Sequence, residues 1–420
     1  MTKLRTHRWF TVVPPQSRDG GSLEKLSLPA MVCIVVLFCA AAVTAAPAQS
    51  VAFTTLADFD GANGVYSQAG LVLGTDGNFY GTTSQGGNTG CFAFGCGTIF
   101  KITPAGTITR LYSLCSKPNC ADGASPEAGL VLGTDGAFYG TTSEGGPGGY
   151  GTVFKITPSG TLTTLYGFNG GDGAVPRAGL VQASDGNFYG TTSGGNETWG
   201  TIFKITPTGF LTGLHYFNFT DGAWPFAGLM QAPDGNLYGT TTSGGRGGSG
   251  TVFRITPGGT LTTLYSFCSQ PNCADGGAPD AGLVQASDGH FYGTTSEGPP
   301  GGYGTVFKIT QSGTLTTLYS FNGSDGEAPY AGLVQASDGN FYGTTVLGGA
   351  DGDGTVFEIT PDGVPTTLHT FDGGDGASPY GGLVQAPNGF FYGTTQQGGA
   401  HNYGTVYRLG VVRTCATCAP

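Results

Sequence analysis

The sequence predicts an all-β fold, a seven-bladed β-propeller of four-stranded antiparallel blades whose ring is closed by the N-terminal strand completing the last blade. Three observations support this prediction. A segment of about 50 residues recurs seven times, each copy contains four short strand-like runs, and the two ends of the array are offset by one strand. A period near 50 residues is typical of propellers and related repeat architectures.

The repeat is tracked by the glycine of an Ala-Gly-Leu motif, which reads Gly-Gly-Leu in the last copy. These glycines are Gly70, Gly129, Gly179, Gly228, Gly282, Gly332 and Gly382, separated by 59, 50, 49, 54, 50 and 50 residues. In the third copy, the strand-like runs are 178–183, 187–192, 200–206 and 210–217. They are rich in β-branched and aromatic residues, and Asp185-Gly186 between the first two is a strong hairpin signal.

The ends of the array predict how the ring closes. Val51–Phe59 (VAFTTLADF) aligns with the fourth-strand pattern TLTTLYSF, whereas Gly404–Leu409 (GTVYRL) is a third strand with no fourth-strand copy after it. The first strand of the array therefore completes the blade that contains Gly382. Such closure leaves no unpaired sheet edge, and a linear solenoid would need capping repeats instead.

The N-terminus has the layout of a secretory signal, with five Lys or Arg residues by position 25, an uncharged run over Met31–Val43 and small residues after it. We expect a signal peptide over 1–48, or alternatively an N-terminal anchor, then the propeller over 49–410 and a short tail over 411–420. The predicted location is secreted or cell-surface. Without residues 1–48 the formal charge is 11 − 25 = −14, which argues against a nucleic-acid partner.

The cysteines of the exported part occur in close pairs, and in such a chain the expected state is a local disulfide. The pairs are Cys91/Cys96, Cys115/Cys120, Cys268/Cys273 and Cys415/Cys418. Zinc is the alternative, but no histidine spacing supports it.

Loops of a propeller blade alternate between two faces. The strand 1–2 and 3–4 turns are nearly constant here, whereas the strand 2–3 and blade-to-blade loops vary, so the variable face is the predicted binding face. Its aromatic residues suit a glycan or protein ligand. The predicted ligand-binding residues are Tyr150, Trp199, Trp224, Tyr303 and Tyr403, and Tyr330 and Tyr380 lie on the same face. The alternative role for these side chains is packing between blades.

The blade-to-blade loops also carry an acid at corresponding positions. These residues are Asp122, Asp172, Asp221, Asp275, Asp325 and Asp375. A ring of carboxylates could bind calcium, which prefers several oxygen ligands. The alternative is that each Asp caps its own turn. At one third-strand position six blades carry Lys or Arg, and we expect these cations to lie on solvated strand faces. Glu358 breaks this set in the remaining blade.

No catalytic residues are predicted. The chain has no Gly-x-Ser-x-Gly elbow and no His-Glu-x-x-His motif, and His215 and His369 replace a recurrent fourth-strand Tyr, which indicates a structural position. An enzyme must gather unlike residues at one asymmetric place, and the repeat shows recurrence instead.

The repeat over Val51–Leu409 has the sequence pattern AGLVQASDGNFYGTT…GTVFKITPxGTLTTLYSF. This pattern resembles the GloVer-type tandem repeat of secreted bacterial proteins, also known as choice-of-anchor repeat proteins. The resemblance implies export and a repeat-built β fold, and it supplies no catalytic residues. We therefore expect a monomeric, non-enzymatic binding or surface-interaction module without a required cofactor, whose ligand is a glycan or an exported protein. The alternative is a propeller lyase or hydrolase with a metal near the central channel.

Overall fold

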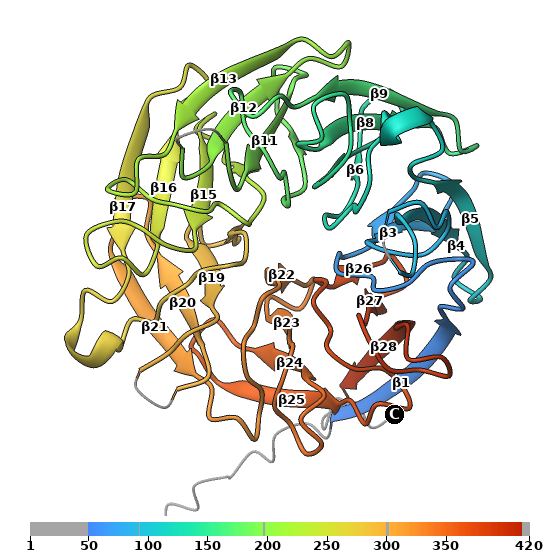
Figure 1. Ribbon diagram of the computed structural model, residues 1–420. Helices are drawn as coiled ribbons and strands as arrows, with labels where there is room; N and C mark the ends of the chain where they lie inside the picture. Colours follow the sequence, from blue (N-terminus) through green and yellow to red (C-terminus); the bar gives the residue numbers. More distant parts are fainter. Residues whose placement is uncertain (1–48, 92, 196–197, 300–301, 414–420) are drawn as a thin grey trace, which may run out of the picture. The chain divides into compact units, whose positions relative to one another are not determined.

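The computed structural model describes residues 49–91, 93–195, 198–299 and 302–413. These residues form seven four-stranded sheets, arranged as the blades of a ring (Figure 1). All neighbouring strands within a blade are antiparallel. The predicted seven-bladed β-propeller is confirmed.

Each blade runs from a two-residue inner strand to a longer outer strand. Blade 1 contains β2 (Val72–Leu73), β3 (Phe79–Thr83), β4 (Thr98–Ile102) and β5 (Ile108–Ser113). Blade 2 contains β6 (Val131–Leu132), β7 (Phe138–Thr142), β8 (Thr152–Ile156) and β9 (Leu162–Gly167). Blade 3 contains β10 (Val181–Gln182), β11 (Phe188–Thr192), β12 (Thr201–Ile205) and β13 (Leu211–Tyr216). Blades 4 and 5 contain β14 (Met230–Gln231), β15 (Leu237–Thr241), β16 (Thr251–Ile255) and β17 (Leu261–Ser266); and β18 (Val284–Gln285), β19 (Phe291–Thr295), β20 (Thr305–Ile309) and β21 (Leu315–Ser320). Blade 6 contains β22 (Val334–Gln335), β23 (Phe341–Thr345), β24 (Thr355–Ile359) and β25 (Pro365–Thr370), and blade 7 contains β26 (Val384–Gln385), β27 (Phe391–Thr394), β28 (Thr405–Arg413) and β1 (Gln49–Asp58).

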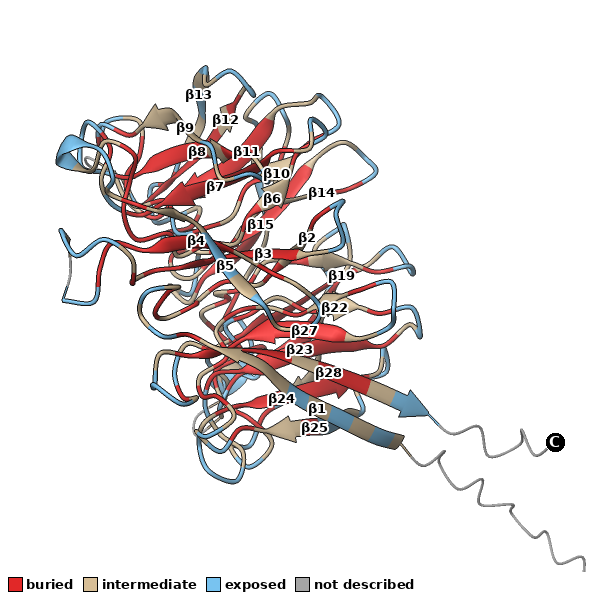
Figure 2. Cartoon of the chain, turned by 90° about the vertical axis from the view of Figure 1, so that its right-hand side faces the viewer, coloured by how far each residue is buried: buried red, intermediate tan, exposed pale blue. Residues whose placement is uncertain are grey.

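Burial explains why the second and third strands are so constant. Every residue of the Phe-Tyr-Gly-Thr-Thr strand β11 is buried, because both faces of an inner strand pack against neighbouring blades. The outer strand β13 contains only half-buried and exposed residues. Figure 2 shows the same gradient, from red inner strands to tan and pale blue on β1 and β5.

The Asp-Gly turns are fixed by the second-strand tyrosines. In the third blade, the Tyr189 hydroxyl donates to the Asp185 carboxylate at 2.8 Å, and five other blades repeat this bond at 2.7–2.9 Å. At Asp288, burial acts to raise the pKa, but hydrogen bonds from Lys308, the His290 backbone N–H and Tyr292 outweigh it and lower the pKa to about 2. The folded state therefore favours the ionised carboxylate at this turn.

The Ala-Gly-Leu glycines form the innermost ring. A Cβ on Gly70 would lie 2.8 Å from the carbonyl oxygen of Gly382, and the same approach recurs between the glycines of successive blades at 3.1–3.5 Å. Second-strand threonines bridge the blades as well; Thr82 donates to the Ala128 carbonyl at 2.8 Å, and Thr394 donates to the Ala69 carbonyl at 2.9 Å. At Gly70 a side chain would require the blades to move apart, and at five of the other six positions the space for a Cβ is tight.

Ring closure follows the predicted route. Strand β1 pairs with β28 from Gln49↔Arg413 to Asp58↔Thr405, so the first strand completes the last blade (Figure 1). Phe53 stacks on His369 with ring centroids 3.6 Å apart and contacts Tyr407. The observed strands extend beyond the predicted bounds, because β28 includes residues 411–413 of the predicted tail.

Glu358 lies at the seam, by which we mean the region where the paired strands β1 and β28 close the ring. Its side chain is buried, and it accepts hydrogen bonds from Arg413, from Asn340 at 2.5 Å and from Gln49 at 2.9 Å. Arg413 also pairs with Asp338 at 3.0 Å. Glu358, which breaks the set of third-strand cations, is thus buried at this point because β28 supplies Arg413 as its charged partner.

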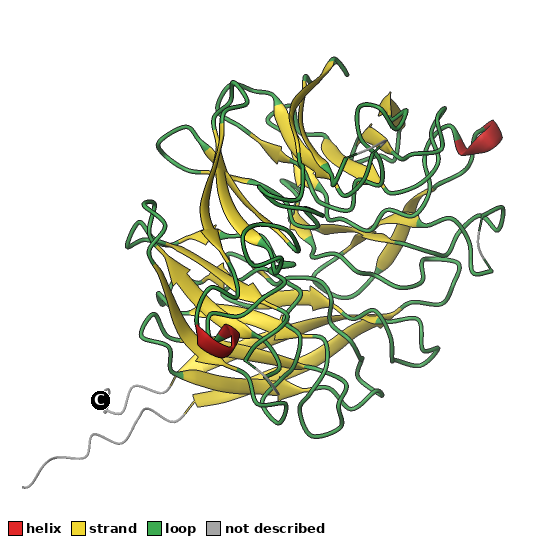
Figure 3. Ribbon diagram, turned by 60° about the vertical axis from the view of Figure 1, so that its left-hand side comes forward, coloured by secondary structure: helices red, strands yellow, loops and turns green. Residues whose placement is uncertain are grey.

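Three predicted cysteine pairs are bonded in the structure: Cys91–Cys96, Cys115–Cys120 and Cys268–Cys273. The latter two close the 3₁₀ turns η1 (Pro118–Cys120) and η2 (Pro271–Cys273), which are the two short red helices of Figure 3. Cys415 and Cys418 lie outside the described residues, as do the predicted signal and anchor segments. Neither helix in the described part of the chain has the length and apolar character needed to cross a membrane.

Candidate functional site

The loops of the variable face are locked to each other by short backbone bridges. In each blade, the strand 2–3 loop pairs with the blade-to-blade loop that precedes that blade, as in the bridges Ala124↔Glu144, Gly277↔Glu297 and Ala377↔Gln397. The residues between these bridges and the glycine ring therefore have fixed positions around the axis.

A polar pocket of about 530 Å³ occupies the centre of this face. Its lining includes the residue that immediately precedes the Ala-Gly-Leu motif, once from each blade. These seven residues are Gln68, Glu127, Arg177, Phe226, Asp280, Tyr330 and Tyr380. Thr242, Ser296 and Glu297 from the ends of second strands complete the polar lining.

The Asp280 carboxylate of the pocket is held at both of its oxygens. Its Oδ1 accepts a hydrogen bond from the Thr242 hydroxyl at 2.7 Å, and its Oδ2 accepts one from the Ser296 hydroxyl at 2.6 Å. Burial raises the pKa of Asp280 above its ordinary value; the two hydroxyls oppose this shift and the charge of Glu297 adds to it. A cation or a hydrogen-bond donor entering the pocket would favour the ionised form.

On the blade 2 to 4 side, the charges are already paired. Arg177 Nε lies 3.2 Å from Glu127 Oε2, and the Arg177 guanidinium lies 5.4 Å from the centroid of the Phe226 ring. The Ser143 hydroxyl donates to Glu127 Oε1 at 2.8 Å. This part of the pocket is preorganised and close to neutral.

Two aromatic rings from blades 6 and 7 form the remaining wall. Tyr330 and Tyr380 stack with centroids 5.4 Å apart and an interplanar angle of 12°. Burial raises the pKa of the Tyr330 hydroxyl, and the negative charge of Asp280 raises it further. Both phenol hydroxyls are therefore neutral hydrogen-bond donors at ordinary pH. They line the same pocket as the Asp280 carboxylate, and their two stacked rings form its flat apolar surface.

The asymmetry of this pocket was missed from the sequence, although the signal is present. Within the constant Ala-Gly-Leu lead-in, one position changes in nearly every copy (Gln, Glu, Arg, Phe, Asp, Tyr, Tyr). The interpretation that the repeat places the same residues in every blade is thus wrong near the central axis of the ring. Equivalent positions of the seven blades converge there on one pocket, and the unlike residues at these positions make it asymmetric.

The five predicted ligand aromatics lie on the variable face but do not form one group. Tyr150, Trp199, Trp224 and Tyr303 are 38–41% exposed, whereas Tyr403 is partly buried against the blade 7–blade 1 core. Trp199 and Trp224 lie 5.8 Å apart, and Phe219 joins them at 5.1 Å from Trp199. The backbones of these two loops are also joined, since the Trp224 N–H donates to the Trp199 carbonyl at 2.8 Å.

The six loop aspartates have partners in their own loops and in the outer strand that precedes each loop. Asp122 accepts hydrogen bonds from the Tyr112 hydroxyl at 2.8 Å and from the Ser116 N–H at 2.9 Å. Asp172, Asp275 and Asp325 accept the equivalent tyrosine bond. Asp221 and Asp375 bond His215 at 3.0 Å and His369 at 2.8 Å, so the two histidines replace tyrosine in the same contact. Calcium binding by these residues stays a prediction.

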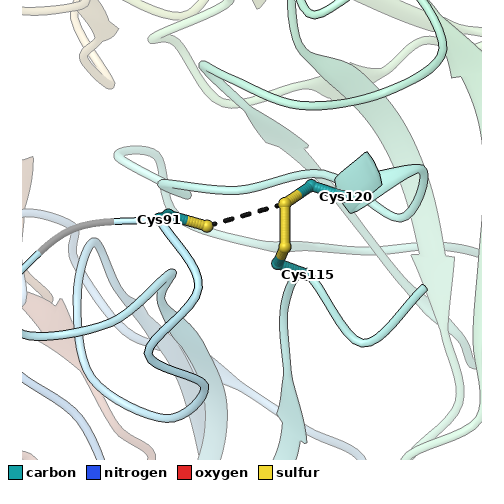
Figure 4. A group of neighbouring side chains, drawn as sticks. All are labelled: Cys91, Cys115 and Cys120. Carbon is teal, nitrogen blue, oxygen red and sulfur yellow. Dashed lines mark hydrogen bonds between the residues drawn. A yellow bond between two sulfur atoms is a disulfide. The ribbon is translucent and has the colours of Figure 1, made fainter. Parts of the chain in front are cut away.

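Among the described residues, one group of three His, Cys, Asp or Glu side chains has ligand atoms within 4.8 Å of one another: Cys91, Cys115 and Cys120. Figure 4 shows Cys91 Sγ facing the Cys115–Cys120 bond, 3.6 Å from Cys120 Sγ. All three sulfurs are held in disulfides, so none is a free thiolate for a metal.

A second hollow of about 620 Å³ lies on the opposite face, where the turns are constant. Met230, Leu283 and Val284 give it an apolar lining. It adjoins a gap in the hydrogen bonds between blades: Ser184 N–H donates to Gln231 at 2.8 Å, but Pro233, in the equivalent place of the next blade, has no N–H to offer Gln285. This hollow lacks the charged and aromatic groups of the central pocket.

Comparisons with known proteins give distant structural similarities. A Bacteroides uniformis protein provisionally assigned as a 6-phosphogluconolactonase is 17% identical, with 71% of this chain and 83% of that chain covered and a TM-score of 0.47. A luciferin-regenerating enzyme is 13% identical, with coverages of 86% and 95% and a TM-score of 0.43. A Dyadobacter fermentans protein of unknown function is 11% identical, with coverages of 86% and 99% and a TM-score of 0.44.

No curated protein matches the chain. The Gloeobacter/Verrucomicrobia repeat, in contrast, matches residues 42–182, 90–274 and 268–417, which together span nearly all of the propeller. The chain therefore belongs to the Gloeobacter/Verrucomicrobia repeat family.

Proposed function

We propose that this protein is an exported, non-enzymatic binding module and that its ligand is a glycan seated in the central pocket of the variable face. The observation that carries the proposal is the composition of that pocket. Stacked Tyr330 and Tyr380 offer a flat apolar surface, and the pocket of about 530 Å³ adds a fixed carboxylate and several hydroxyls. Sugars present both an apolar ring face and many hydroxyls, which this combination of groups complements.

Export is supported by the N-terminal pattern of basic, apolar and small residues and by the three disulfides, which persist in oxidising compartments. The exposed Trp199, Trp224 and Phe219 cluster offers a longer glycan or an exported protein a second contact surface outside the pocket.

The proposal is tested by thermal-shift measurements with a panel of soluble oligosaccharides. A ligand that prefers the folded state raises the melting temperature. We expect the shift to disappear in Tyr330→Ala and Tyr380→Ala and to persist in Phe210→Ala, a matched loss of a 72% exposed aromatic side chain in a turn on the opposite face. A shift that survives both pocket variants would remove the central pocket as the binding site.

A hydrolase is the second candidate, and Asp280 is the observation that favours it. A carboxyl whose pKa is raised by burial in a pocket can act as a general acid. A lyase or hydrolase with a metal at the channel has less support, since the described carboxylates of the pocket do not form a group of three ligand atoms within 4.8 Å. Release of reducing ends from the panel, abolished in Asp280→Asn, would establish the hydrolase.

A further inference from the structure

The charges of the central pocket are compensated on one side only. Arg177 neutralises Glu127 on the side of blades 2 and 3. Within the described ranges, no Lys, Arg or His nitrogen lies within 4.0 Å of the carboxylates of Asp280 or Glu297. The side formed by blades 5 to 7 therefore carries uncompensated negative charge beside the Tyr330 and Tyr380 rings.

The Asp280 carboxylate is built into position rather than left free on the surface. Two hydroxyl donors from neighbouring second strands, Thr242 and Ser296, hold one oxygen each at 2.7 and 2.6 Å. Each carboxylate oxygen retains a further lone pair that can accept a donor from a ligand. Glu297 lies exposed at the rim of the same pocket.

We propose that this side of the pocket, formed by Asp280, Glu297, Tyr330 and Tyr380, binds the protonated amino group of an amino sugar of the glucosamine type. An ammonium group is attracted both by carboxylates and by the faces of aromatic rings, and the structure places these groups together. This inference rests on the proposed function and adds the chemical class of the ligand to it.

Two other ligand classes fit less well. A divalent cation prefers several converging oxygen ligands, and the described carboxylates of the pocket do not form a group of three ligand atoms within 4.8 Å of one another. An uncharged sugar would satisfy the hydroxyls and the rings but would leave the negative charge without a partner. A bound ammonium would also favour the ionised form of Asp280, which burial disfavours in the free protein.

The test compares two oligosaccharides that differ only at nitrogen: the glucosamine tetrasaccharide, which is cationic in mildly acidic buffer, and its fully N-acetylated form. Binding to the full chain is measured by isothermal titration calorimetry. We expect the cationic form to bind about tenfold more tightly and this preference to weaken with added salt. Asp280→Asn should abolish the preference. Asp351→Asn, which removes an exposed carboxylate from a variable-face loop of blade 6, should leave it unchanged.

Arg177→Gln should change the affinity in the opposite direction to Asp280→Asn. It leaves Glu127 unpaired and should therefore tighten binding of the cationic form several-fold. Equal binding of the two tetrasaccharides would overturn the amino-sugar inference and leave glycan binding standing. A preference that persists in Asp280→Asn, or that falls equally in Asp351→Asn, would reveal non-specific attraction to an acidic protein and would also overturn the inference. Binding of neither tetrasaccharide, without a response to the wider panel, would refute the proposed function as well.

Discussion

Replacing Tyr407 by Phe should stabilise the propeller. Tyr407 is fully buried in β28, and its hydroxyl has no hydrogen-bond partner among the described residues. A buried hydroxyl without a partner costs about 1–3 kcal/mol of folding free energy. The six other blades carry Phe at the equivalent position: Phe100, Phe154, Phe203, Phe253, Phe307 and Phe357. Tyr407→Phe keeps the ring that packs against Phe53 and Phe371 and removes only the oxygen, so we expect a gain of about 1–2 kcal/mol.

Urea unfolding curves of the wild type and the variant measure this gain as a higher midpoint at an unchanged slope. Tyr189→Phe is the matched control, because it removes the same atom from a tyrosine whose hydroxyl donates to Asp185 at 2.8 Å. The control should lose about 1 kcal/mol. An unchanged or lower midpoint for Tyr407→Phe would refute the reasoning and show that the hydroxyl has a partner, such as a buried water.

Four further predictions follow from the seam, the turns and the variable face. Glu358→Gln and Arg413→Gln should each lower the free energy of unfolding by about 1–3 kcal/mol, measured by urea unfolding. The double variant should lose clearly less than the sum of the two single losses, because the two charges interact. Additive losses would show that they do not. Deleting residues 49–58 should lower the melting temperature of the whole ring, since β28 then presents an unpaired edge; an unchanged melting temperature would contradict the closure. The folded-state pKa of Asp288 is lowered to about 2, so the stability that this carboxylate contributes is present above its ordinary pKa and is lost as the pH falls toward about 2. Asp288→Asn should therefore reduce the loss of folding free energy on the acid side of a plot of stability against pH. An unaltered plot would show that this carboxylate contributes nothing. Trp199→Ala should change stability by less than about 1 kcal/mol, because the ring is 41% exposed; unfolding would assign this side chain to the core.

The fold was predictable because each blade repeats the same local signals. Hairpin turns such as Asp185-Gly186, the recurrent Phe-Tyr-Gly-Thr-Thr second strands and the offset of Val51–Phe59 all point to the same closed ring. The cysteine pairs were predictable for a similar reason, since each pair lies within one short loop.

The candidate site was predictable only in part. Tyr330 and Tyr380 were placed on the correct face, but their stacking, and the convergence of Arg177 and Asp280 on the same pocket, depend on the closed geometry of the ring. Residues about 50 positions apart have no local signal that they meet. The same limit applies to Glu358, whose partner Arg413 comes from another blade.

The seam also determines how the protein can be tethered. Gln49 and Arg413 lie opposite each other where every other blade has its strand 3–4 turn, and Figure 2 shows the ends of β1 and β28 side by side. That turn lies on the face opposite the pocket. A support or a fused domain attached through either of these residues would therefore sit behind the ring and leave the pocket facing outward, and a surface display of this protein could use either end without blocking access to the ligand.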